Sequence, residues 1–318
     1  MNVHRQVQLA EQRIRPYILK TPVEYSPWLS RDTGAEVWLK LEHIQTTGSF
    51  KLRGAANHIL SASEEARNRG LITASTGNHG SAFAYMCHKL GVPGTIYLPN
   101  GTAQSKIDYM RMYGVELKFI GTDPLESELA AREASAQTGK SFISPYNDEA
   151  VVAGQGTMGL ELFAQLPDLS TVFVPVGGGG LISGTAGYLK GARPGIEIIG
   201  CSPEKSPAMH RSLEAGEIIE VATYPTWSDG TAGGLEPGSI TFDLCQKYVD
   251  RMELVSEEDI QAALRYLLEK HQWMVEGAAG LALATFRRIA AEYRDKQVVL
   301  VLCGRKLGID RLRELIRD

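Results

Sequence analysis

The sequence contains few cysteines and no paired cysteine spacing. Only four of its 318 residues are cysteine, and they lie far apart, at Cys87, Cys201, Cys245 and Cys303. Disulfide frameworks and zinc sites need cysteines in pairs or at short spacings. The sequence therefore predicts reduced thiols and no bound metal.

The chain also lacks a long hydrophobic run and a large excess of either charge. Its 33 lysines and arginines are mixed with 37 aspartates and glutamates, for a formal net charge of -4. This pattern offers no basic face for nucleic acid and no polybasic membrane anchor. Residues 1–16 carry charges throughout, so they form no secretory signal, and no window approaches the ~18 apolar residues of a spanning helix. We expect a cytoplasmic protein whose partner is small and neutral or zwitterionic.

Short β-type runs alternate with helical patterns almost from end to end. This alternation predicts an α/β fold, in which helices cover both faces of a parallel sheet. The expected strands are residues 36–42, 70–75, 94–99, 115–121, 170–176, 196–201 and 297–303. No repeat or Gly/Pro/Ser-rich linker divides the chain. We expect a small domain at residues 71–148 and a large domain formed by residues 1–70 and 149–318.

The segment STGNHG, residues 75–80, follows an expected strand and precedes a helix expected to begin near Ser81. Open α/β sheets bind ligands in the crevice where strands give way to helices. Small residues let backbone N–H groups converge there at a positive helix N-terminus, which suits a carboxylate. The alternative is a tight turn in which Asn78 caps the helix.

The segment VGGGGLISGTAG, residues 176–187, has four consecutive glycines after another expected strand. Because each glycine costs roughly 0.5–1 kcal/mol relative to alanine in regular structure, the run indicates close backbone approach to a ligand. It is no Walker loop, and Ser183 or Ile182 stands where a dinucleotide motif needs its last glycine. The run favours a single phosphate group over a structural turn.

The segment LCGRKLG, residues 302–308, places Cys303 at the end of an apolar strand, facing the same type of crevice. A buried free cysteine is usually inert packing, so this signal counts only together with the other loops.

Lys51 lies in TTGSFKLRG, residues 46–54, at the expected first turn of a helix. The helix dipole and desolvation by Phe50 both favour its neutral amine, which is a nucleophile. The alternative is a surface lysine that extends from an amphipathic helix. A nucleophilic lysine, a phosphate loop, a carboxylate loop and a strand-end thiol together predict an aldehyde cofactor with one phosphate, namely pyridoxal phosphate.

The segments LKLEHIQTTGSFKLRGA, ASTGNHG, PVGGGGLISG, VEGAAG and VLCG follow one another in this order. In this combination the chain resembles the fold type II pyridoxal-phosphate enzymes, in the serine/threonine dehydratase and serine racemase branch. The resemblance covers nearly the whole chain. It implies a tryptophan synthase β-like fold with two open, twisted, mostly parallel sheets and flanking helices. It also implies a homodimer or homotetramer of stand-alone catalytic units without a regulatory domain.

The resemblance assigns roles to individual residues. It implies that Lys51 holds the cofactor covalently and acts as the catalytic base, with Phe50 beside the ring. Asn78 would bind the phenolic oxygen, Cys303 would face the pyridine nitrogen, and Glu276 would lie near the ring in a role left open. The phosphate would bind the backbone N–H groups of Gly177, Gly178, Gly179, Gly180 and Leu181. The substrate carboxylate would lie among Ser75, Thr76, Gly77, Asn78 and His79.

A thiol opposite the pyridine nitrogen has a chemical consequence. Because a thiol is a weak donor, it would not keep this nitrogen protonated, and the ring would be a poor electron sink. Elimination of a β-leaving group suits such a site, with Lys51 as the base. We expect an ammonia-lyase that converts a 3-hydroxy amino acid such as threonine or serine into a 2-oxo acid and ammonia.

Several alternatives remain. One is an amino-acid racemase, and another is a dehydratase for hydroxyaspartate, phenylserine or a hydroxyectoine breakdown product. A third is a nucleotide-binding or regulatory α/β protein without chemistry.

Some positions depart from the family pattern. Arg305 and Lys306 replace the family Gly-Asn; they either bind an extra acidic group of the substrate or point to solvent, and we expect the latter. The run CSPEKSPAM lacks the acidic ligands of the racemase cation site, so no metal is expected. Thr76 replaces the racemase serine, which weakens the racemase alternative.

Overall fold

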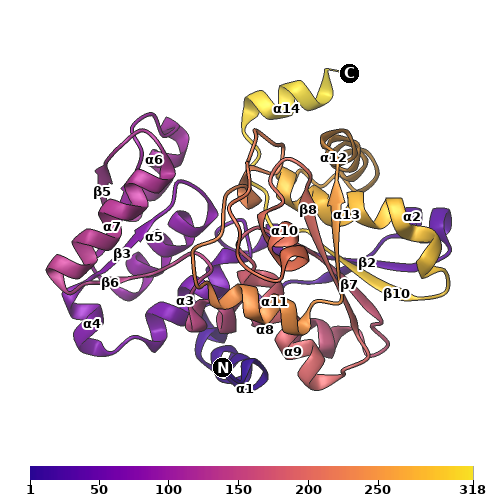
Figure 1. The fold of residues 1–318 in the computed structure, drawn as a ribbon, viewed down its shortest axis with the longest axis horizontal. Helices are drawn as coiled ribbons and strands as arrows, with labels where there is room; N and C mark the ends of the chain where they lie inside the picture. Colours follow the sequence, from indigo (N-terminus) through magenta and orange to yellow (C-terminus); the bar gives the residue numbers. More distant parts are fainter. Residues whose placement is uncertain (318) are drawn as a thin grey trace.

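A computed structural model describes residues 1–317, which contain two separate β-sheets (Figure 1). In the larger sheet every neighbouring pair is parallel except β1 and β2. Its strand order is β1 (Val23–Tyr25), β2 (Glu36–Lys40), β10 (Gln297–Val301), β7 (Thr171–Pro175), β8 (Glu197–Pro203) and β9 (Arg251–Val255).

The smaller sheet has four strands, and all of them are parallel. Its order is β5 (Glu116–Phe119), β4 (Gly94–Leu98), β3 (Leu71–Ala74) and β6 (Ser141–Phe142). The two mostly parallel sheets confirm the predicted α/β class. The domain boundaries at residues 71 and 148 stay a prediction.

Helices flank both sheets, and α5, α6 and α7 surround the smaller one (Figure 1). The helices are α1 (Val3–Ile14), α2 (Pro27–Thr33), α3 (Lys51–Ser61), α4 (Glu64–Arg69), α5 (Asn78–Leu90), α6 (Gln104–Arg111), α7 (Pro124–Thr138), α8 (Glu149–Gln165), α9 (Gly180–Ala192), α10 (Ala208–Ala215), α11 (Ile240–Tyr248), α12 (Glu257–His271), α13 (Gly277–Ile289) and α14 (Ile309–Ile316). None of the helices within residues 1–317 is both long and apolar enough to cross a membrane.

All seven predicted strands are present, each with slightly different ends, but β1, β6 and β9 were missed. β1 and β6 have only three and two residues, too few to show a hydrophobic period. β9, with the sequence RMELV, lies at the edge of its sheet and is only partly buried along most of its length. Its sequence therefore lacks the apolar run that marks a central parallel strand.

A buried cluster of charges anchors α3, the helix that begins with Lys51. The Arg53 guanidinium lies 2.8 Å from carboxylate oxygens of both Glu42 and Glu161, and the Lys40 ammonium lies 2.7 Å from Glu161. All four side chains are at most 1 % exposed. Because a buried charge is tolerated only when it is paired, this cluster fixes α3 against β2 and α8. It thereby fixes the position of Lys51.

Candidate active site

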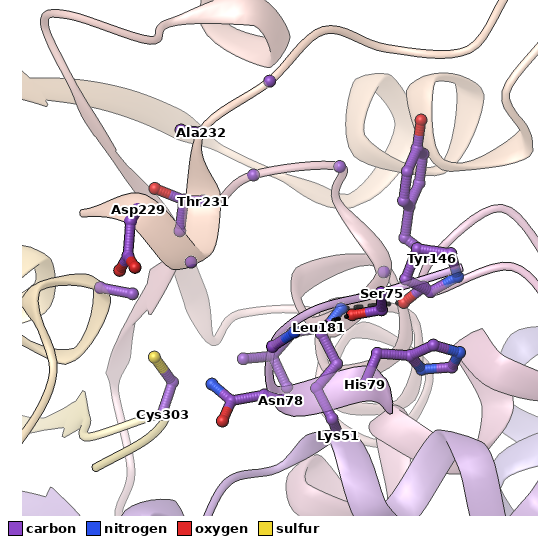
Figure 2. A pocket seen from close by; sticks show the side chains of 18 of the residues that line it. Lys51, Ser75, Asn78, His79, Tyr146, Leu181, Asp229, Thr231, Ala232 and Cys303 are labelled. Carbon is purple, nitrogen blue, oxygen red and sulfur yellow. Dashed lines mark hydrogen bonds between the residues drawn. The ribbon is translucent and has the colours of Figure 1, made fainter. Parts of the chain in front are cut away.

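The three loops singled out in the sequence meet in one pocket, with a cavity of about 300 Å³. β3 ends before residues 75–79, β7 ends before the glycine run, and β10 ends before Cys303. The first residue of α3, Lys51, joins them (Figure 2). The predicted site residues that line this pocket are Phe50, Lys51, Ser75, Thr76, Gly77, Asn78, His79, Gly177, Gly178, Gly179, Gly180, Leu181, Glu276 and Cys303.

Lys51 begins α3, as the sequence predicts. Its Nζ donates a hydrogen bond of 2.9 Å to the carbonyl oxygen of Pro145 and lies 5.1 Å from the centre of the Phe50 ring. Burial lowers the pKa of Lys51 to about 8, although Cys303 and Glu276 act in the opposite direction. A substantial fraction of this amine is therefore neutral near neutral pH, as a nucleophile requires.

The helix after residues 75–77 begins at Asn78, three residues earlier than expected. Asn78 does not cap this helix, because Gly77 is the N-cap residue and no side chain caps the helix. Within residues 1–317 the backbone N–H groups of Asn78 and His79 have no hydrogen-bond acceptor. Two free donors at a helix N-terminus suit a carboxylate.

His79 is 2 % exposed, and neither of its ring nitrogens has a hydrogen-bond partner within residues 1–317. Burial, and secondarily the charge of Lys51, lowers the pKa of His79 to about 3. The ring is therefore neutral at physiological pH.

The glycine run leads into α9, which begins at Gly180. Gly179 has a φ of 83°, a left-handed conformation that favours glycine. A Cβ added at Gly178 would lie 2.5 Å from the Tyr146 ring, so this position cannot hold a side chain without movement of the ring. The N–H groups of residues 177–181 donate no hydrogen bond within residues 1–317. This cradle of free donors at a helix N-terminus fits a phosphate.

Cys303 and Glu276 lie together at another part of the pocket. Burial, and secondarily the charge of Glu276, raises the pKa of the Cys303 thiol well above its usual value, so the thiol keeps its proton. The Glu276 carboxylate accepts hydrogen bonds of 2.8 and 2.9 Å from the Asn78 amide and one of 3.0 Å from the N–H of Lys306. Burial raises the pKa of Glu276. Glu276 therefore holds the Asn78 amide at the pocket.

The two unexpected cations behave differently. Arg305 is exposed, as we expected. Lys306 is not directed to solvent: its ammonium donates to the Ser81 hydroxyl and lies 4.3 Å from the centre of the Tyr109 ring. The expectation was wrong for Lys306, because these partners lie about 200 residues away in the sequence and no local pattern identifies them. Neither cation lines the pocket.

The burial of Lys306 predicts a pH-dependent contribution to stability. Burial, together with the nearby positive charges of Lys106 and Arg305, lowers the pKa of Lys306 to about 8, from 10.5, despite the opposing effect of Glu276. A lysine whose folded pKa lies below its unfolded value destabilises the fold while it is charged, and this cost disappears as pH rises from about 8 to 10.5. We expect the melting temperature of the wild type to rise relative to that of Lys306→Met between pH 7 and pH 10. A difference that does not change with pH would contradict this assignment.

The sequence did not identify several residues that line the pocket. Among them are Pro124, Pro145, Tyr146 and residues 229–234, which include Asp229 and Thr231 (Figure 2). They lie in irregular segments or at a helix start. The available signals were the glycine in the sequence SDG, residues 228–230, and the Pro-Tyr pair at residues 145–146. Neither pattern is specific for a binding site.

Residues 14–304 match the family described as Pyridoxal-phosphate dependent enzyme. The chain belongs to this family. It is 39% identical over 310 residues to the L-threonine ammonia-lyase of Thermotoga maritima, covering 98% of this chain and 77% of that protein. Pyridoxal phosphate is therefore its cofactor, as predicted.

Two solved structures are similar over the same range. Threonine deaminase isoform 2 of Solanum lycopersicum has a TM-score of 0.94 at 32% identity and covers 98% of this chain and 86% of that chain. Maize serine racemase has a TM-score of 0.92 at 30% identity, and the match covers 98% of this chain and 95% of that chain. The predicted fold type and branch are thus confirmed.

The residues present fit this cofactor. The free N–H groups of residues 177–181 match a phosphate, the Lys51 amine matches an aldehyde, and the buried Oδ1 atom of Asn78 has no partner within residues 1–317. Within the same residues no three His, Cys, Asp or Glu side chains are arranged to hold a metal ion. The individual roles of the site residues stay predictions.

Proposed function

We propose that the protein is an ammonia-lyase that removes water from threonine or serine and yields a 2-oxo acid and ammonia. The observation that carries this proposal is that the Lys51 amine and the protonated Cys303 thiol line one pocket with two free helix N-termini. The similarity to L-threonine ammonia-lyase supports it.

The proposed roles follow from the positions of the side chains. Bound pyridoxal phosphate withdraws electrons from the substrate Cα and so acidifies its proton. The N–H groups of Asn78 and His79 hold the substrate carboxylate, and Lys51 Nζ removes the α-proton. The β-hydroxyl group leaves with this proton as water. The released enamine takes up one water and gives the 2-oxo acid and ammonia.

Cys303 favours elimination over racemisation in this proposal. Its thiol keeps its proton because burial raises its pKa, and a neutral thiol is a weak hydrogen-bond donor. Such a donor would not keep the pyridine nitrogen of the bound cofactor protonated. The cofactor would then be a poor electron sink, which favours loss of the β-hydroxyl group over racemisation.

A substrate panel tests the reaction. We expect 2-oxo acid and ammonia in equal amounts from threonine or serine, faster than any change in enantiomer ratio. The panel also includes 3-hydroxyaspartate and phenylserine, whose preference over threonine would replace the proposed substrate. Interconversion of enantiomers with negligible ammonia would identify a racemase instead. A colourless protein that does not bind pyridoxal phosphate would contradict every enzymatic version.

We also propose a cytoplasmic location and a homodimer or homotetramer. The four cysteines are free and buried, which suits a reducing compartment. The oligomer follows from the family resemblance. Light scattering of the purified protein measures its mass, and a monomer of 34.7 kDa at working concentration would exclude the oligomer.

A further inference from the structure

Residues 229–234, here called the wall segment, form one side of the pocket without belonging to either sheet. Thr231 lies so close to the glycine run that a Cβ at Gly177 would lie 2.8 Å from its carbonyl oxygen. Most of the wall segment is exposed. Two bonds of its own hold it on one side, since the Thr231 hydroxyl donates a hydrogen bond of 3.0 Å to the carbonyl oxygen of Ser228 and the Gly233 N–H donates one of 3.0 Å to the Ser206 hydroxyl. The residues that follow the wall segment add further contacts.

Glu236, two residues after the wall segment, makes these contacts. Its carboxylate lies 2.9 Å from the Arg132 guanidinium of α7 and accepts a hydrogen bond of 2.8 Å from the Asn147 amide and one of 3.4 Å from the Ser144 hydroxyl. All three partners come from the smaller sheet's side of the molecule, on α7 or just after β6. Charge-assisted contacts of this kind are stronger than neutral ones.

Tyr146 connects Glu236 with the glycine run. Its hydroxyl accepts a hydrogen bond of 2.9 Å from the backbone N–H of Glu236, while its ring covers Gly178. Burial, above all, raises the pKa of Tyr146, so its phenol remains neutral near neutral pH. Figure 2 shows Tyr146 beside the pocket, across from Thr231. One side chain thus contacts both the predicted phosphate cradle and the backbone of Glu236, just after the wall segment.

We propose that Glu236 is a positioning residue for the elimination of water from threonine or serine. This inference rests on the function proposed above. Glu236 ties the wall segment to α7 and to Tyr146. The pocket wall, the glycine run and the smaller sheet therefore keep one arrangement around the substrate. A small displacement of groups around a reacting substrate is sufficient to slow the reaction strongly.

The test compares Glu236→Ala with Glu236→Gln and with Glu128→Ala. Glu128 is a matched control, because it pairs with the same Arg132 at 2.7 Å and is similarly buried, yet it makes none of the bonds that Glu236 makes to Asn147 and Ser144. We expect Glu236→Ala to lower kcat for threonine about tenfold or more, as expected when a charge-assisted contact worth about 1.4 kcal/mol is lost. Glu236→Gln keeps one acceptor oxygen but loses the charge, so its kcat should lie between those of the wild type and Glu236→Ala, and Glu128→Ala should keep wild-type kcat. Glu236→Ala should lower the melting temperature at least as much as Glu128→Ala, because it also loses the bonds to Asn147 and Ser144.

An unchanged kcat in Glu236→Ala would overturn the proposal, as would an equal loss of kcat in Glu128→Ala. Amide hydrogen exchange of residues 229–236, measured with pyridoxal phosphate bound, reports how firmly the wall segment is held, independently of turnover. We expect faster exchange in Glu236→Ala alone. If the wild type eliminates neither threonine nor serine, the proposed function fails. In that case faster exchange in Glu236→Ala would still support the role of Glu236 in holding the wall segment, and unchanged exchange would overturn that role.

Discussion

Lys51→Ala will lose about 10³-fold or more of the elimination activity, because a single amine is assigned both to hold the cofactor and to remove the α-proton. A positioned general base alone contributes roughly 10²- to 10⁴-fold. The amine is suited to this task because its pKa is lowered to about 8. In the cofactor-free protein, the rate of covalent capture of pyridoxal phosphate should rise with pH, reach half of its maximum at about pH 8 and level off above that, since capture needs the neutral amine.

A lowered pKa does not by itself identify the lysine. Burial also lowers the pKa of Lys306 to about 8 and lowers that of Lys40. Lys40 is held by Glu161, and Lys306 by Ser81 and Tyr109, and neither lines the pocket. Lys306→Ala is therefore the matched control and should capture the cofactor normally. Borohydride reduction and peptide mapping should place the pyridoxyl group on Lys51, and an adduct on Lys40 or Lys306 would refute the assignment.

The sequence predicted the site as three strand ends, and the sheets explain why this succeeded for two of them. β7 and β10 are parallel neighbours, so the glycine run and Cys303 lie at the same edge of one sheet. β3 lies in the other sheet. Its approach to that edge depends on how the two sheets pack, which hydrophobic periodicity does not encode. The family resemblance, rather than the pattern, supplied this part.

What the sequence did not predict depends on contacts between irregular segments. The Tyr146 ring over Gly178 and the Glu236 carboxylate on Arg132 both join residues that lie tens of positions apart. Loop segments without a period carry no local signal of their partners. The interpretation of the glycine run was incomplete for the same reason. Ligand approach accounts for its free N–H groups, but the need for glycine at position 178 also comes from a protein ring.

Gly178→Val will weaken the binding of pyridoxal phosphate at least about a hundredfold while the rest of the chain stays folded. The free N–H groups of residues 177–181 are the predicted phosphate donors. Each hydrogen bond to a charged group contributes about 1.5–3 kcal/mol, so the loss of two accounts for this factor. A valine Cβ at this position would begin 2.5 Å from the Tyr146 ring, and either the ring or the loop must move. Titration with the cofactor, followed by absorbance, measures the change.

Two further variants separate the loop from the ring and from general stability. Gly195→Val is the control for stability, because Gly195 is exposed and no heavy atom lies within 4 Å of an added Cβ. It should bind the cofactor as the wild type does. Gly178→Val/Tyr146→Ala removes the overlap with the ring, yet it should still bind at least tenfold more weakly than Tyr146→Ala, because the valine remains beside the N–H groups. If the double variant binds as Tyr146→Ala does, the glycine serves only the ring. If Gly178→Val itself melts normally and binds fully, the predicted phosphate cradle is wrong.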